Sequence, residues 1–431
     1  MSKSRAPSVP CDVKDPALAE SGKARIEWAF HSMSVLQHIR KQFIKTQPFR
    51  EVRIAFCGPI TPESANLAIA LRDGGGEPWL CASDARSTHD DVAASLVRDY
   101  HMPVFAFREE SSEALAAHAA AILQPRPQLL IDEGCRLTQA LQSLDPEFLP
   151  EVIGAIESDQ AGVDCLRALS RKQALPVPVI SQTGIPVKDH FAKRYGTAES
   201  VVGAIAEKTN VLLAGLTAVI AGFGEAGRAI AAKLREAGAH VIVTEVDAVR
   251  ALEATMEGYR VMTMADAAAL ADLAITVTGN RSVIGRDHFD KFKNGAILCN
   301  AGCSAVEIDV EALRSAAMSR RECRDSVDEF SMRDGRKLFL LSSGEPLVRP
   351  GEGYPSAVQD IAFAIQALSA EYLIKRRSLL EKAVHPVPAD VGPLVAKIKL
   401  ESMGLKIDRL TVEQEQYLGI RLAQAAGSQQ P

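Results

Sequence analysis

The chain contains a turn whose glycines are spaced to hold a pyrophosphate. An apolar strand leads into Gly222-x-Gly224-x-x-Gly227, and a helix follows from about Glu225. Gly222 permits a tight bend, Gly224 lets the backbone approach a phosphate, and Gly227 lets the helix pack close to the sheet. Because the first N–H groups of a helix are unpaired and its dipole is positive there, this turn predicts a dinucleotide site.

The carboxylate of Glu245 indicates which dinucleotide fits. Glu245 follows the apolar strand His240–Thr244 and lies 18 residues beyond Gly227. At that place a carboxylate accepts hydrogen bonds from both ribose hydroxyls and repels a 2′-phosphate. We therefore predict NAD rather than NADP as the cofactor, with Glu225 and Ala226 in the helical turn that contacts it.

Composition argues against several classes of partner. The 431 residues are 47% hydrophobic and 24% charged, with a net charge of −5 and dispersed basic residues, so neither nucleic acid nor another polyanion is expected to bind. No segment approaches the roughly 18 apolar residues of a membrane span, and the polar N-terminus does not resemble a signal peptide. The eight cysteines include no CxxC pair. We expect reduced thiols in a cytoplasmic protein, and no metal site.

The order of apolar runs and helical patterns predicts the fold class. Between Val52 and Ile180 short apolar runs alternate with helix-like segments, and the same alternation returns after the helical stretch Phe191–Leu216. Such alternation favours parallel sheets that helices cover on both faces. We predict an α/β protein with two doubly wound parallel-sheet domains, followed by C-terminal helices.

Several long strings of residues carry a family resemblance. The cofactor domain of S-adenosylhomocysteine hydrolase (adenosylhomocysteinase) resembles the stretch GFGEAGRAIAAKLREAGAHVIVTEVDAVRALEATMEGYRVMTM. The likeness continues through ITVTGNRSVIGRDHFDKFKNGAILCNAGCSAVEIDVEAL, and it includes RYGTAES, LLIDEG, STHDD, GYPSAVQ and RLTVEQEQYLGI. It therefore covers nearly the whole chain.

The resemblance implies a three-part protein that works with NAD. Residues 1–190 and 350–390 would form a split substrate-binding domain, residues 191–349 a Rossmann NAD-binding domain, and residues 391–431 a C-terminal oligomerisation segment with a shortened tail. In that family NAD+ transiently oxidises the 3′-hydroxyl of an adenosyl ribose. We therefore expect a nucleoside-like small molecule as substrate, and a homodimer or homotetramer.

The resemblance also assigns residues to the site. Lys188 matches a lysine that faces the 3′-hydroxyl, and Glu133 stands where the family has a catalytic aspartate. Thr61 and Glu63 match residues that hold the substrate. Further expected contacts are Lys193, Cys303 and Tyr354 on the substrate side, and Thr278, Gly279 and Arg349 on the NAD side.

Other positions of the family pattern carry different residues in this chain. Pro59 replaces a general-acid/base histidine, Ser158 a ribose-binding glutamate, and Ala192 the aspartate that partners the lysine. Because a positioned acid or base contributes about 10²–10⁴-fold to a rate, these losses predict slow hydrolysis of S-adenosylhomocysteine. We expect instead an enzyme that acts on a nucleoside or another adenosyl-type substrate through transient oxidation of a hydroxyl.

Two alternatives stay open at this stage. One is a catalytically silent NAD-binding regulator or scaffold, and the other is the family's hydrolysis, kept through compensating residues. A separate hypothesis concerns the ligand's charge. Since Lys193 and Arg349 are cations where the family has neutral amides, the ligand is expected to carry a carboxylate or phosphate.

Overall fold

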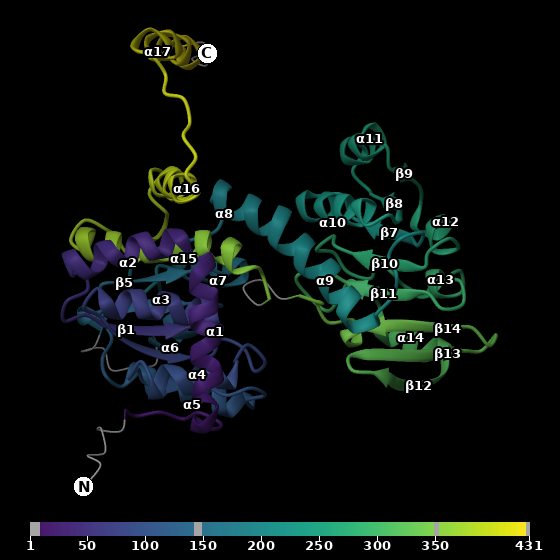
Figure 1. Ribbon diagram of the computed structural model, residues 1–431, viewed down its shortest axis with the longest axis horizontal. Coiled ribbons are helices and arrows are strands. Elements are labelled where there is room, and N and C mark those ends of the chain that lie inside the picture. Colours follow the sequence, from purple (N-terminus) through teal and green to yellow (C-terminus); the bar gives the residue numbers. More distant parts are fainter. Residues whose placement is uncertain (1–8, 142–148, 349–352, 428–431) are drawn as a thin grey trace.

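The computed structural model describes residues 9–141, 149–348 and 353–427, which form two bodies joined by helices (Figure 1). Each body is built on one sheet. In the first, seven parallel strands run in the order β15-β6-β5-β4-β1-β2-β3. Their bounds are β1 (Arg53–Cys57), β2 (Glu77–Cys81), β3 (Val104–Phe105), β4 (Leu129–Asp132), β5 (Gly154–Glu157), β6 (Val179–Ser181) and β15 (Val384–Pro386).

Helices cover both faces of this first sheet because its strands are apolar on both sides. Ile54 and Phe56 of β1 share a core with one set of helices, and Ala55 and Cys57 share a core with the other. The first set comprises α1 (Ala19–Ser32), α2 (Ser34–Thr46), α3 (Pro62–Asp73), α4 (Asp90–Arg98), α15 (Ser356–Arg376) and α16 (Val391–Ser402). The second comprises α5 (Ser112–Leu123), α6 (Arg136–Leu141) and α7 (Gln160–Arg171). Burial on both faces is typical of parallel strands.

The second body has the strand order β12-β13-β14-β11-β10-β7-β8-β9. Its strands are β7 (Thr217–Ala221), β8 (His240–Thr244), β9 (Arg260–Val261), β10 (Leu273–Thr276), β11 (Ile297–Asn300), β12 (Ala317–Arg324), β13 (Val327–Met332) and β14 (Lys337–Leu341). Its helices are α9 (Ala198–Thr209), α10 (Glu225–Glu236), α11 (Ala248–Met256), α12 (Met264–Ala268), α13 (Arg286–Phe289) and α14 (Val310–Ala316). The predicted fold class is confirmed. The antiparallel pairings of β12 with β13 and of β13 with β14 were not predicted.

A helical segment with a π-helical turn joins the two bodies. α8 (Pro186–Phe191), the π-helical turn η3 (Ala192–Thr197) and α9 follow one another without interruption. The helix ends at Thr209 rather than at the predicted Leu216, because Asn210 adopts a left-handed backbone conformation with φ 54°. π-Helical turns are rare and occur often at functional sites.

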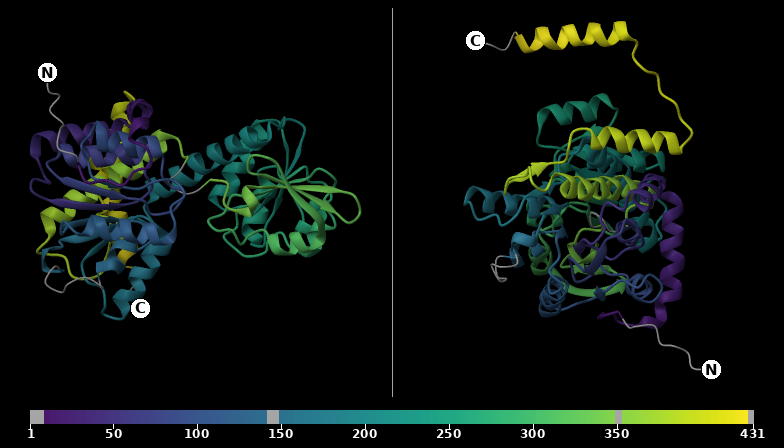
Figure 2. Two further views of the ribbon diagram at one scale, coloured as in Figure 1. Left: turned by 90° about the horizontal axis from the view of Figure 1, so that it is seen from below. Right: turned by 90° about the vertical axis from the view of Figure 1, so that its left-hand side faces the viewer.

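The C-terminal helices differ in how they pack. Val395 and Ile398 of α16 lie in the core of the first body, so we propose that this domain extends to Ser402 instead of ending at residue 390. In contrast, α17 (Val412–Gly427) projects away from both bodies on an extended linker (Figure 2). Within the described ranges, no helix is long and apolar enough to cross a membrane.

A buried carboxylate ties three helices of the first body together. Asp360 of α15 is fully buried and accepts hydrogen bonds from the N–H groups of Val35 at 3.0 Å and Leu36 at 2.8 Å, at the start of α2. Lys399 of α16 lies 3.0 Å from the same carboxylate. The carboxylate thus neutralises a lysine and caps a helix at once.

Replacing Asp360 with alanine is expected to lower the free energy of unfolding by about 3–5 kcal/mol, because the change leaves a lysine and two N–H groups without their buried partner. Chemical denaturation measures this. Lys375→Ala is the matched control, since Lys375 is exposed and pairs with Glu371 on the same helix, and this change should cost less than about 1 kcal/mol. Equal effects of the two substitutions would contradict the prediction.

Candidate active site

The glycine turn after β7 has the geometry that a dinucleotide needs. Gly222 has φ +103°, and a Cβ atom there would lie 2.8 Å from the carbonyl oxygen of Val277. A Cβ at Gly227 would lie 2.0 Å from the oxygen of Gly222, so only glycine lets α10 approach β7 this closely. Gly224 is the N-cap of α10, which begins at Glu225 as predicted. The first turn of α10, with Ala226, therefore presents free N–H groups to a phosphate.

Glu245 is held in place by three backbone N–H groups. Its Oε2 accepts a hydrogen bond from Phe223 at 2.7 Å, and its Oε1 accepts from Val246 at 2.7 Å and Asp247 at 3.0 Å. Partial burial acts to raise the pKa of this carboxyl, but the N–H groups and Arg250 outweigh it, so the pKa is lowered. Glu245 is therefore an ionised, oriented acceptor beside the glycine turn, which fits the ribose of NAD.

Replacing Glu245 with alanine is expected to raise the Kd for NAD by roughly 10- to 100-fold, because hydrogen bonds to a charged group contribute about 1.5–3 kcal/mol. Titration calorimetry measures the Kd. Glu253→Ala is the control, since Glu253 pairs with Arg228 on the surface of the same body. An unchanged Kd in a folded Glu245→Ala protein would show that this carboxylate does not hold the cofactor.

Glu307, which the sequence analysis did not identify, positions the expected NAD contacts Thr278 and Gly279. Glu307 is fully buried and accepts hydrogen bonds from the Thr278 N–H at 2.9 Å, the Thr278 hydroxyl at 3.0 Å and the Gly279 N–H at 2.8 Å. A Cβ at Gly302 would lie 1.7 Å from its Oε1. Glu307 thus joins the loop after β10 to the loop after β11, which carries Cys303.

Lys193 lies beside the start of α10, close to the glycine turn. Its Nζ lies 3.3 Å from Glu225, the first residue of α10, and His190 Nδ1 lies 3.7 Å from the same carboxylate. Because Glu225 balances its charge, Lys193 gives no support to the hypothesis of an anionic ligand. Arg349, the other cation in that hypothesis and an expected NAD contact, lies outside the described residues.

Lys188 is fixed by backbone carbonyls. Its Nζ donates hydrogen bonds to the oxygen of Gln182 at 2.8 Å and to that of Ser158 at 3.4 Å. Burial lowers the pKa of this amine, although Asp189, Glu133 and other nearby carboxylates act in the opposite direction. A lowered pKa increases the fraction of the amine that is neutral near pH 7, and only the neutral amine can accept a proton.

Glu133 and Glu157 are carboxyls at the ends of adjacent strands. Burial, followed by the charge of Asp159, raises the pKa of Glu133 to about 7, while a 3.3 Å hydrogen bond from Ser83 opposes the shift. Burial also raises the pKa of Glu157 to about 8. Glu157 accepts hydrogen bonds from the N–H groups of Cys135 at 2.7 Å and Asp159 at 2.8 Å. It therefore ties together the loops that carry Glu133 and Asp159.

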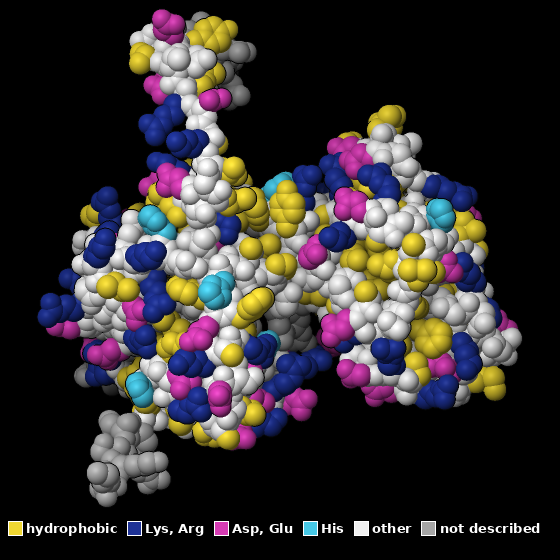
Figure 3. Space-filling model, in the orientation of Figure 1, with side chains coloured by type: hydrophobic (Ala, Val, Ile, Leu, Met, Phe, Trp, Pro, Cys, Tyr) yellow, Lys and Arg dark blue, Asp and Glu magenta, His cyan; other side chains and the backbone are white. Residues whose placement is uncertain are grey.

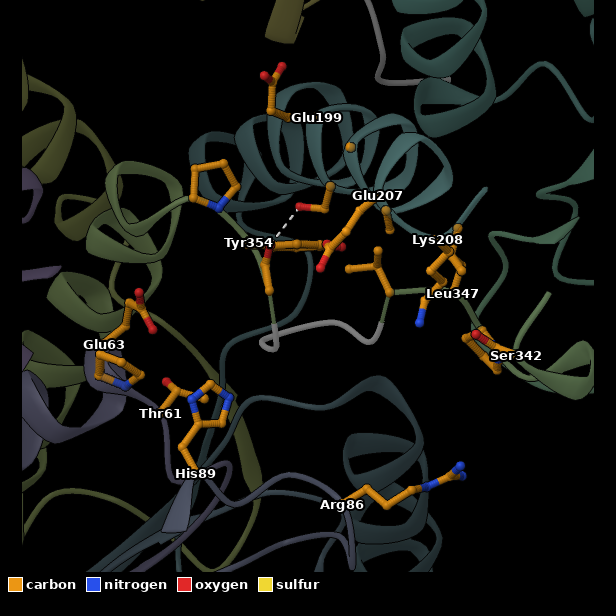
Figure 4. A pocket seen from close by; sticks show the side chains of 18 of the residues that line it. Thr61, Glu63, Arg86, His89, Glu199, Glu207, Lys208, Ser342, Leu347 and Tyr354 are labelled. Atoms are coloured by element: carbon orange, nitrogen blue, oxygen red, sulfur yellow. Dashed lines mark hydrogen bonds between the residues drawn. The ribbon is translucent and has the colours of Figure 1, made fainter. Parts of the chain in front are cut away.

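A cavity of about 1430 Å³ opens between the two bodies, where the surface is visibly hollowed (Figure 3). Three expected substrate contacts line it, namely Thr61, Glu63 and Tyr354 (Figure 4). Lys188 and Glu133 are not among its lining residues. The structure thus places the expected residues in two groups, one in the cavity and one at the strand ends of the first sheet.

Each of the three cavity residues also has a structural contact. Thr61 is the N-cap of α3 and accepts a 3.3 Å hydrogen bond from the N–H of Ser64. Glu63 accepts a 2.7 Å hydrogen bond from the hydroxyl of Ser356. Tyr354 shares a 2.8 Å hydrogen bond with Thr197 of η3. These contacts fix the three side chains on the wall of the cavity, which residues of both bodies line.

Cys303 does not have the character of a nucleophile. Partial burial and the negative charges of Glu307 and Asp159 raise the pKa of its thiol, and Lys193 only partly opposes them. A reactive cysteine needs the reverse, since the thiolate is the attacking form. Its electrostatic neighbours come from both bodies, so Cys303 lies where the cofactor side and the substrate side meet.

Sequence reasoning missed Glu157, Glu307 and His89, of which His89 lines the cavity. Glu157 had a usable signal because it ends β5, and ligands of open α/β sheets gather outside the carboxyl ends of strands. Glu307 had none, since it lies in a loop and acts through backbone contacts.

Comparison with known proteins identifies the family. Residues 193–351 match the model described as "S-adenosyl-L-homocysteine hydrolase, NAD binding domain", and residues 10–146 match "S-adenosyl-L-homocysteine hydrolase". An adenosylhomocysteinase of Aquifex aeolicus (strain VF5) is 45% identical over 408 residues, 94% of this chain and 98% of the relative. The chain belongs to the adenosylhomocysteinase family. Its cofactor is therefore NAD, as predicted, and the glycine turn and Glu245 have the geometry to hold it.

Other relatives have similar coverage. The adenosylhomocysteinase of Thermosynechococcus vestitus (strain NIES-2133 / IAM M-273 / BP-1) is 44% identical over 96% of this chain and 97% of its own. That of Thermococcus kodakarensis (strain ATCC BAA-918 / JCM 12380 / KOD1) is 41% identical over 94% of this chain and 96% of its own. Among solved structures, a dipicolinate synthase polypeptide from Bacillus halodurans covers 76% of this chain and 99% of its own at 11% identity, with a TM-score of 0.48. That score is too low to support an argument.

Proposed function

We propose that this member of the family oxidises a ribose hydroxyl of a nucleoside or adenosyl-type substrate transiently, and that hydrolysis of S-adenosylhomocysteine is not its main reaction. The observation that carries the proposal is the amine of Lys188, whose pKa is lowered by burial, beside a Glu133 carboxyl with a pKa near 7. The Glu133 carboxyl can change protonation state close to physiological pH, and the lowered pKa of Lys188 increases the fraction of its amine that can accept a proton, as acid–base catalysis requires.

The residues divide the work as follows. Lys188 accepts the proton of the substrate hydroxyl through Nζ, which the carbonyls of Gln182 and Ser158 orient. Glu133 exchanges a proton with the neighbouring carbon or with water. Thr61 and Glu63, which line the cavity, hold the end of the nucleoside that lies away from Lys188 and Glu133. When bound, NAD supplies reversible acceptance of a hydride.

One experiment tests the proposal and its rivals together. The purified chain with NAD+ is mixed with adenosine, other nucleosides or S-adenosylhomocysteine, and NADH absorbance and released thiol are followed. NADH formation from a nucleoside with thiol release below about 1% of a relative's rate would support the proposal. If no substrate gives either NADH or thiol, the result would favour a silent NAD-binding protein.

A second candidate is the hydrolysis for which the relatives are named. It is favoured by 45% identity over nearly the full length of the Aquifex aeolicus protein. The proposed activity and this hydrolysis both begin with oxidation of a ribose hydroxyl, so only the release of thiol distinguishes them. Release of homocysteine at a rate comparable to that of a relative would replace our proposal with this one.

We also propose that the chain assembles with copies of itself through α17 and its linker. Large apolar side chains on this projecting arm are strongly exposed, namely Leu405, Ile407, Leu410, Val412 and Tyr417. Exposed apolar side chains at this density mark interaction surfaces. In sedimentation experiments, a chain ending at Ser402 should be monomeric, and the full chain a dimer or tetramer. A full chain that sediments as a monomer would contradict the proposal.

A further inference from the structure

His89 lies on the wall of the cavity that the first body provides. It precedes α4 as its N-cap and is half-buried, and its imidazole is drawn beside Thr61 in Figure 4. Its N–H donates a 2.9 Å hydrogen bond to the carbonyl of Ile60, and the Ile60 N–H donates to Ser87 at 3.0 Å. The backbone of His89 is therefore fixed next to the expected substrate contact Thr61.

The ring of His89 has one defined tautomer. Arg25 of α1 is hydrogen-bonded through Nη2 to Nδ1 of His89, and its Nη1 donates to the carboxylate of Asp91 at 2.9 and 3.1 Å. Because a guanidinium group can only donate, Nδ1 must be the acceptor, and the single proton of the neutral ring is on Nε2. Within the part of the chain that the structure describes, no protein group bonds to Nε2.

The charges around His89 keep its ring neutral. Burial and the positive charge of Arg25 lower the pKa of the imidazole, and Arg108 acts in the same direction, while Asp91 and Glu63 act against them. The side chain therefore presents a fixed N–H donor to the cavity at neutral pH. Such a donor suits a hydrogen-bond acceptor, and it does not suit a cation.

We propose that His89, oriented by Arg25, is a substrate-binding residue whose Nε2–H donates a hydrogen bond to an uncharged acceptor atom of the ligand, such as a ring nitrogen or hydroxyl oxygen of a nucleoside. This inference rests on the proposed function, because it takes the cavity as the substrate site. It assigns a contact that the family resemblance did not supply.

Binding of adenosine to the NAD-loaded protein tests the contact. His89→Phe keeps an aromatic ring and removes the donor, so the Kd should rise roughly 5- to 50-fold, and His89→Gln, which restores an N–H donor, should recover most of the loss. His38→Phe, on the exposed face of α2, is the matched control and should bind as the parent does. Unchanged binding by His89→Phe would overturn the inference.

Nitrogen NMR of ¹⁵N-histidine protein tests the tautomer without any activity. The His89 signal is assigned by its loss in His89→Phe, and it should report a neutral ring protonated at Nε2 at neutral pH. In Arg25→Met the pKa of the ring should be higher than in the parent, because the positive charge of Arg25 is lost while Asp91 and Glu63 remain. A parent ring that titrates above pH 6.5, or carries its proton on Nδ1, would overturn the inference. If the parent binds no nucleoside, the proposed function fails, and this measurement still decides whether His89 is a fixed donor.

Discussion

Replacing Lys188 with methionine is expected to lower the rate of NADH formation from a bound nucleoside by roughly 10²–10⁴-fold, the usual contribution of a positioned base. Methionine has a similar length and no proton acceptor of comparable basicity. In the proposed role, the amine of Lys188 accepts the proton because burial lowers its pKa and two carbonyls hold its Nζ at 2.8 and 3.4 Å. Single-turnover absorbance at saturating substrate measures the chemical step directly.

Two further variants separate the chemistry of Lys188 from its packing. Lys188→Arg keeps a long cation but should not restore the rate, because a guanidinium group does not lose its proton near neutral pH. Lys172→Met removes an exposed lysine just after α7 and should leave the rate unchanged. A Lys188→Met protein that binds NAD, is folded and keeps the parent rate would remove Lys188 from the mechanism.

Local residue patterns predicted the backbone geometry of the glycine turn and the NAD cofactor. The glycine turn, the start of α10 and the carboxylate after β8 all lie within one short stretch of chain, so each follows from backbone geometry at a few positions. Gly222 and Gly227 are fixed by close backbone contacts that no larger side chain permits. Local steric requirements of this kind are visible in a sequence.

The substrate side was predicted less completely because its contacts join distant parts of the chain. His89 is oriented by Arg25, 64 positions away, and Glu63 by Ser356, 293 positions away. The resemblance gave Lys193 as a substrate contact, which stays a prediction, and the sequence did not indicate that its Nζ pairs with Glu225 at the start of α10. Such contacts depend on the packing of whole elements, and no spacing in the sequence encodes them.

Glu133 should give the activity a pH dependence centred near neutral pH. Burial and Asp159 raise the pKa of its carboxyl to about 7. If Glu133 acts as a base, activity is lost as the pH falls through about 7, because the carboxylate becomes protonated. If it acts as an acid, activity is lost as the pH rises through the same value. In either case, Glu133→Gln should remove this loss of activity near pH 7, the Glu133 limb, from the rate–pH profile.

Two substitutions next to Glu133 should move that limb in opposite directions. Asp159→Asn removes the negative charge that raises the pKa of Glu133, so the limb should shift to lower pH, while asparagine can still cap α7 through the Gly162 N–H. Ser83→Ala removes the hydrogen bond that lowers this pKa, so the limb should shift to higher pH. Asp164→Asn, on an exposed face of α7, should leave it in place. The measurement is the rate–pH profile of the parent and the three variants. A purely structural role of Asp159 and Ser83 would lower the rates without shifting the pH dependence in opposite directions. A pH dependence that is the same in the parent, Asp159→Asn and Ser83→Ala would show that it comes from a group other than Glu133.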